Sequence, residues 1–326
     1  MLSRIARGLY DLGRSVERAQ NVARILEVHL VIHLERSALE DGEIWSAIAD
    51  SFSCGLESPD ERSLYGVLVL SSHHPYSVCR CIAEAREEGR AMREHISEEM
   101  WLHLNRAHLD FQVLTFDSVV SIGRSEFNRQ VEVFADALHG LADDSMIRGP
   151  SWAFLKLGKL MERALMVCRI LEIRRKASGL GVSGGPVDVY QWQALLRSLA
   201  GYEPYRRAYD ARVVPSRVLE FVLQRREFPR SLSCSLEEMR GAFLVVSSGS
   251  ALQLELEQRT IRILEDLRGY DVEQMLNQAS FDVDLERLLS SLERLESLVE
   301  LAYFTSHRPA SAPISVAPGA GLVAQQ

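Results

Sequence analysis

The sequence predicts an all-α protein, a multi-helix bundle of two related helical halves in a pseudo-twofold arrangement. Three observations support this prediction. Apolar residues recur at three- and four-residue steps through most of the chain, strand-like alternation is nearly absent, and one helical motif occurs twice. With 326 residues, of which 47% are hydrophobic and 25% charged, the chain is long enough for one large core or two smaller ones.

The periodicity is clearest in residues 3–35, where one face of the expected helix is apolar. A long amphipathic helix therefore begins the fold. Similar patterns predict further helices, in chain order, at residues 43–53, 61–71, 76–96, 98–110, 112–139, 151–177, 187–200, 216–226, 235–246, 250–268 and 281–305.

Glycine and proline separate these runs, most strongly between Gly179 and Pro186, which we expect to form a mobile loop. From Ser306 onward the residues are mainly Ala, Pro, Ser and Gly, and such a segment cannot offset the entropy cost of ordering. We therefore expect one helical domain over residues 1–305, with halves of about 1–145 and 146–305, and a disordered tail over 306–326.

The repeated motif lies in the first helix of each half. Residues 12–19 recur at a spacing of 145 as residues 157–164, and both copies contain Leu-Gly-basic and Glu-Arg-Ala. Two unrelated amphipathic helices have no reason to share these identities, so a duplication explains them better. Because a glycine inside a helix costs about 1 kcal/mol relative to alanine, Gly13 and Gly158 suggest that the two repeat helices pack closely against each other.

A weaker echo extends the repeat. It aligns Pro75 with Pro215, and the pair Arg86 and Arg90 with the pair Arg226 and Arg230. If the halves form one cleft, these four guanidiniums can converge on a carboxylate or a phosphate.

The first repeat helix also has a polar face opposite its apolar stripe. One interpretation is a solvated face with weak ion pairs. The other is a polar pocket between the halves, where the carboxylates accept from arginines and spare N–H donors face an anionic ligand. The residues concerned are Arg14, Glu17, Arg18, Asn21 and Arg24, with Glu162 and Arg163 in the second copy.

A second basic row follows at helical spacing, with interleaved glutamates. Surface ion pairing is one explanation and anion binding is the other. Its members are Arg86, Arg90 and Arg93, followed by Trp101 and Asn105.

Composition excludes several classes of protein. The net charge of −8 opposes nucleic-acid binding, and no apolar run approaches the roughly 20 residues that span a bilayer. We read no signal peptide or membrane anchor, and the five cysteines, an odd number, suit a reducing compartment, so we expect a cytoplasmic protein. The chain is arginine-rich, because only three of its 37 basic residues are lysines, which codon usage can explain without a ligand.

The sequence predicts no cofactor and no metal site. His29 and His33 stand four residues apart, but they do not reproduce the Glu-x-x-His pairs of di-iron bundles. The chain also has no P-loop and no Gly-rich phosphate fingerprint.

The order of these motifs resembles the alpha-E family. Residues 9–14 and 17–24 match its opening pattern of aromatic-Leu-Gly-Arg followed by Glu-Arg-Ala, and later motifs match in order over about residues 1–305. The chain departs from the family at Asp11, Gln20, His74 and Lys159. The resemblance implies association with circularly permuted ATP-grasp proteins, and with transglutaminase-like or peptidase proteins, in ATP-dependent amide formation. It brings no established catalytic residue.

We therefore expect an accessory helical subunit that does not itself bind ATP and that holds a peptide or amino-acid substrate, or the ligase, for carboxylate–amine ligation. Two alternatives remain open. One is a stand-alone helical enzyme, which could be metal-dependent, and the other is an interaction scaffold unrelated to ligation.

Overall fold

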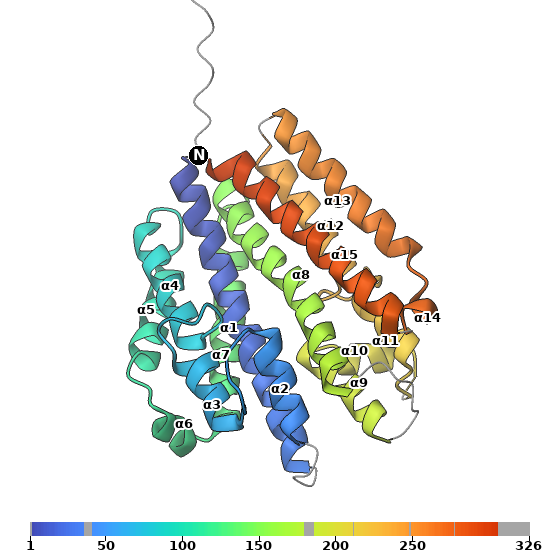
Figure 1. Ribbon diagram of the computed structural model, residues 1–326. Coiled ribbons are helices and arrows are strands. Elements are labelled where there is room, and N and C mark those ends of the chain that lie inside the picture. The colour runs from blue at the N-terminus through green and yellow to red at the C-terminus, as the bar shows by residue number, and fades with distance from the viewer. Residues whose placement is uncertain are drawn as a thin grey trace, which may run out of the picture.

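Two long helices, α1 (Ser3–Glu35) and α8 (Pro150–Ser178), form the centre of the computed structural model. They run side by side in the same direction, and each carries one copy of the repeated motif (Figure 1). The structure describes residues 2–35, 41–178, 186–210, 212–247, 249–276 and 278–305. The expected mobile loop and the expected tail lie outside these ranges.

The remaining elements surround this central pair in two sets. The first set is α2 (Asp41–Ser51), α3 (Glu61–Tyr65), the π-helical turn η2 (Gly66–Leu70), α4 (Val78–Ala91), α5 (Glu98–Phe111), α6 (Phe116–Ile122) and α7 (Arg124–Ser145). The second set is α9 (Pro186–Ser198), α10 (Tyr202–Ala208), α11 (Pro215–Leu223), α12 (Leu232–Val245), α13 (Ala251–Gly269), α14 (Val272–Met275), α15 (Gln278–Val299) and the π-helical turn η3 (Glu300–Phe304).

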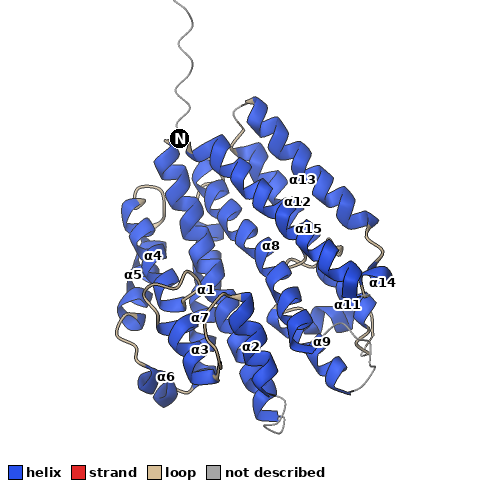
Figure 2. Ribbon diagram, in the orientation of Figure 1, coloured by secondary structure: helices blue, strands red, loops and turns tan. Residues whose placement is uncertain are grey.

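Every regular element in the described ranges is helical, as the sequence predicts (Figure 2). The helices α4 and α7 pack on α1, while α12 and α15 pack on α8. The helix after each central helix also reaches the other one: α2 packs on α8, and α9 contacts both α1 and α8. A local twofold axis between α1 and α8 would produce such contacts across the central pair.

The two motif glycines allow the central helices to touch through their backbones. A β-carbon on Gly13 would lie 2.1 Å from the carbonyl oxygen of Leu155, and one on Gly158 would lie 1.9 Å from that of Tyr10. Leu155 is the repeat counterpart of Tyr10, so each motif glycine contacts the equivalent residue of the other helix. The expected close packing of the repeat helices is confirmed.

Two local expectations are wrong. The run 112–139 is two helices rather than one, because Gly123 adopts a φ of +93°, which residues with side chains rarely tolerate, and separates α6 from α7. The short helices α10 and α14 were not expected, since their seven and four residues are too few to show a helical period. Within the described ranges, no helix is both long enough and apolar enough to cross a lipid bilayer.

Candidate functional site

The Glu-Arg dipeptides of the two motifs pair with each other across the central interface. Arg163 donates from Nε and Nη2 to the two carboxylate oxygens of Glu17, at 2.9 Å each. Arg18 donates in the same way to Glu162, at 2.8 and 2.7 Å. Both carboxylates are fully buried. The two bidentate pairs therefore join the halves, and neither pair can form within one half.

Each of these arginines also donates to the carbonyl oxygen of a proline, Arg18 to Pro75 and Arg163 to Pro229, both at 3.3 Å. Each proline stands two residues before the serine that precedes a packing helix, Ser77 before α4 and Ser231 before α12. These contacts correct the register of the extended repeat: Pro75 corresponds to Pro229, whereas Pro215 is the first residue of α11. The sequence did not indicate this register, because the helix expected at residues 235–246 begins at Leu232, so the serine that precedes it could not be recognised as the counterpart of Ser77.

Glu162 lies between two arginines of α1. Arg14 donates from Nε to Glu162 at 2.9 Å and also pairs with Glu296 of α15. Burial alone would raise the pKa of Glu162, but Arg18 and Arg14 outweigh it and lower that pKa to about 2. This side of the interface holds two arginines and two carboxylates.

Glu17 receives a second guanidinium from outside the repeat motif. Arg230, just before α12, donates to Glu17 at 3.0 Å, to Asn21 at 3.1 Å and to Gln20 at 2.8 Å. Burial opposes the charge on Glu17, yet Arg163 and Arg230 hold its pKa well below the ordinary value. The predicted polar face of α1 is therefore a buried interface.

Sequence reasoning missed one residue of this cluster and undervalued another. His139 of α7 places Nε2 3.8 Å from Glu17, and burial together with Lys159 keeps its pKa well below the ordinary value, so it is neutral at pH 7. Burial, with the nearby Arg163, lowers the pKa of Lys159 to about 8. His139 carries no signal in the sequence, because its position on α7 shows only in three dimensions.

Arg24 lies one turn beyond Gln20 on α1. Its Nε and Nη2 atoms contact Glu132 of α7, at 2.8 and 2.7 Å, while its buried Nη1 atom has no hydrogen-bond partner among the described residues. Gln20 donates to Asp136, one turn along the same helix, at 2.6 Å. A polar layer thus fills the space between α1, α7 and Arg230.

The second basic row lies on the surface of α4 and α5, apart from this cluster. Arg86 and Arg93 both stack on Trp101, with guanidinium-to-ring distances of 5.5 and 5.0 Å. Arg86 also donates to Asn105 at 3.3 Å, and Arg90 is an exposed partner of Glu87. Among the described residues, Arg93 has no carboxylate partner within 4.0 Å.

The four arginines of the extended repeat do not come together. Arg86 and Arg90 share Glu87, Arg226 pairs with Glu237 on the surface, and Arg230 alone is buried at the central interface. The corrected register explains this, because the counterpart of Arg230 is Tyr76.

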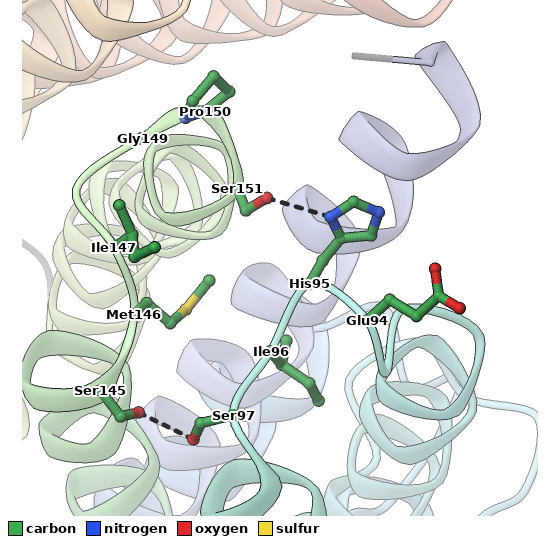
Figure 3. A pocket seen from close by; sticks show the side chains of 10 residues that line it. All are labelled: Glu94, His95, Ile96, Ser97, Ser145, Met146, Ile147, Gly149, Pro150 and Ser151. Carbon is green, nitrogen blue, oxygen red and sulfur yellow. Dashed lines mark hydrogen bonds between the residues drawn. The ribbon is translucent and has the colours of Figure 1, made fainter.

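A pocket of about 340 Å³ lies beside the α4–α5 surface, between the segment that leads into α5 and the segment that leads into α8 (Figure 3). Ser151 lies 3.4 Å from Nδ1 of His95, and Ser145 donates to Ser97 at 2.8 Å. Ile147 is 90% exposed at this pocket. The pocket therefore combines hydroxyl groups with an exposed apolar side chain.

The histidine considered as a metal ligand is buried. Burial lowers the pKa of His29 to about 4, so it is neutral at pH 7, while the side chain of His33 lies outside the described residues. In the described part of the chain, no group of three His, Cys, Asp or Glu residues is placed to hold a metal ion.

Comparison with known proteins identifies distant relatives and a family. Uncharacterized proteins of Mycobacterium bovis and Mycobacterium tuberculosis are 24% identical over 281 residues. The match covers 76% of this chain but only 30% of each relative. No solved structure matches. The model of the Alpha-E family, described as a predicted alpha-helical domain with a conserved ER motif, matches residues 1–304, and the chain therefore belongs to that family.

Proposed function

We propose that this chain is an accessory subunit of an ATP-dependent ligase system that joins a carboxylate to an amine in peptide synthesis or modification. The chain binds a peptide or amino-acid substrate, or the ligase itself. A circularly permuted ATP-grasp protein activates the carboxylate with ATP, and a transglutaminase-like or peptidase protein belongs to some of these systems.

The length of the relatives is the observation that supports this proposal most directly. The match takes up 30% of each mycobacterial relative, so there the Alpha-E region is one part of a longer polypeptide. In the relatives, this helical region is joined to further polypeptide in one chain. In the present protein, the same kind of region could work together with a separate partner protein. The buried Glu-Arg pairs support the same interpretation, because they hold the two halves together and leave the outer surfaces for binding.

The α4–α5 surface is our choice for the docking of the ligase. The exposed Arg93 stacks on Trp101, which lies one helical turn after the pocket residue Ser97. Ile147 is exposed at the same pocket. Trp101 itself is half-buried. Arginine and tryptophan are residue types that dominate binding energies at protein interfaces.

The test is to measure ATP hydrolysis and amide product formation by a purified ATP-grasp partner, with and without this chain. We expect turnover to depend on the chain, and Trp101→Ala or Arg93→Ala to raise the concentration required for half-maximal stimulation. Arg106→Ala is the matched control, because Arg106 is on the same helix, 81% exposed, and pairs only with Asp110 in the described chain. A partner that turns over equally well without the chain would refute the proposal.

A further inference from the structure

The polar layer beside Glu17 differs from the corresponding layer beside Glu162. At the repeat spacing of 145, Gln20 and Asn21 correspond to Leu165 and Met166. In the corrected register, Arg230 corresponds to Tyr76, whose ring lies 5.1 Å from the guanidinium of Arg18. Three polar residues beside Glu17 thus have apolar or aromatic counterparts. Arg24 has an arginine as its counterpart, Arg169, whose donors are used by the Ser51 carbonyl and the Tyr76 hydroxyl.

Positive charge is concentrated around Glu17, although the three arginines of the layer, Arg24, Arg163 and Arg230, face three carboxylates, Glu17, Glu132 and Asp136. Arg163 and Arg230 share one carboxylate, Glu17, whereas two arginines share two carboxylates on the other side. Burial lowers the pKa of Arg230 to about 9, and the nearby Arg163 and Arg24 act in the same direction against Glu17 and Asp136. Because a guanidinium stays charged in a protein, this shift reflects mainly the burial of a cation beside other cations.

One buried donor in the layer is unused. Arg24 is 93% buried, and its Nη1 atom has no partner in the described chain. A buried donor without a partner is destabilising, more so when it carries a charge. The layer reaches solvent through the partly exposed Glu132 and the exposed Asp136 of α7. A ligand that supplies an oxyanion at this edge satisfies the unused donor.

We propose that Arg24 and Arg230 form a binding site for a carboxylate group, carried by the amino-acid or peptide substrate. This assignment rests on the proposed function for the identity of the substrate. A planar carboxylate can accept from two guanidiniums at once, with Gln20 and Asn21 already holding Arg230 in place. Glu132 accepts from the other two nitrogens of Arg24, so its negative charge acts as an internal competitor that opposes a bound anion.

The test uses the full chain without any partner, so its failure is distinct from a failure of the ligase assay. Calorimetric titration compares alanyl-alanine with its C-terminal amide and with inorganic phosphate. We expect saturable binding of the free carboxylate and no binding of the amide. Binding of phosphate alone would overturn the carboxylate assignment, and binding of none of the three would overturn the site.

Two substitutions with opposite expected effects separate binding from folding. Arg24→Gln removes the unused donor and should weaken binding roughly tenfold to a hundredfold. Glu132→Gln removes the internal competitor and should strengthen it. Circular dichroism and thermal unfolding verify that both variants are folded. Equal affinity of Arg24→Gln and the unaltered chain, or weaker binding by folded Glu132→Gln, would overturn the proposal.

Discussion

At the scale of single residues, Glu17 is the carboxylate on which the central interface depends most. It is fully buried and pairs with both Arg163 and Arg230. Glu17→Gln leaves these two guanidiniums without their anion, and we expect the free energy of unfolding to fall by about 3–5 kcal/mol. Urea denaturation followed by circular dichroism measures it. Glu87→Gln, at an exposed pair, is the control and should leave the midpoint unchanged.

Acid should weaken the same interface. Arg18 and Arg14, against burial, lower the pKa of Glu162 to about 2 in the folded chain, below its ordinary value of 4.5. The unfolded chain therefore takes up a proton first as the pH falls. Stability is fully present above about pH 4.5 and is lost progressively toward pH 2.

Thermal unfolding between pH 7 and pH 2.5 tests this sign. Glu162→Gln should be less stable than the unaltered chain at pH 7, and the difference between them should shrink toward pH 2.5. A difference that stays constant with pH would contradict the assignment of acid sensitivity to this carboxylate.

The sequence indicates several of these residues but not their surroundings. The repeat points to Glu17, Arg18, Glu162 and Arg163 because identities recur there beyond the apolar stripe. The repeat could not show that the Glu-Arg dipeptide of each copy pairs with that of the other copy. A solvent-exposed polar face has the same helical spacing of residues. His139 lies on α7 without any local pattern, so only the folded chain reveals its contact with Glu17.

At the scale of helices, the motif glycines set the distance between α1 and α8. A methyl group at Gly13 would overlap the carbonyl oxygen of Leu155, which is backbone and cannot rotate away. Gly13→Ala and Gly158→Ala should therefore force the helices apart and lower the unfolding free energy by more than about 1–3 kcal/mol, the usual cost of overpacking.

Gly140→Ala is the matched control for these substitutions. Gly140 lies inside α7, and a β-carbon there would meet nothing within 4 Å. Alanine at this position should raise the unfolding free energy by about 0.4–1 kcal/mol, because it restricts the unfolded chain and favours the helix. Urea denaturation of the three variants gives the comparison, and destabilisation by all three alike would contradict the role of close backbone contact.

The helices were predictable where they are long and amphipathic, and less so elsewhere. Each of the central helices α1 and α8 shows several turns of apolar spacing, and each was expected to within two residues at either end. The break at Gly123 was missed because apolar spacing continues through it, and only the local backbone angle ends α6. Periodicity measures which face is buried, and it is insensitive to a single residue in the left-handed region.

At the scale of the whole molecule, the exchange of contacts makes the halves depend on each other. Glu17 needs Arg163, and Glu162 needs Arg18, so each half alone exposes a charged and glycine-lined face of its central helix. We expect residues 1–145 and 146–305, expressed separately, to be poorly folded, and their mixture to regain helix content. Circular dichroism of the fragments and of the mixture measures this.

Unfolding of the intact chain should then be a single transition by both circular dichroism and tryptophan fluorescence. Trp101 lies in the first half and Trp192 in the second, so fluorescence reports on both. A fragment with a cooperative transition of its own would contradict the interdependence of the halves.

The face of α1 that pairs with α8 could also pair with the same face of another chain while the protein is being synthesised. On a ribosome that adds about 5–20 residues per second, α8 follows α1 by roughly 7–30 s. Throughout that interval α1 presents Gly13, Glu17 and Arg18, a surface that fits another copy of the same motif. Two nascent chains on one messenger therefore carry matching faces, and their first halves can pair with each other. What favours the correct product is the tether, which keeps α8 of the same chain at a high effective concentration as soon as it emerges.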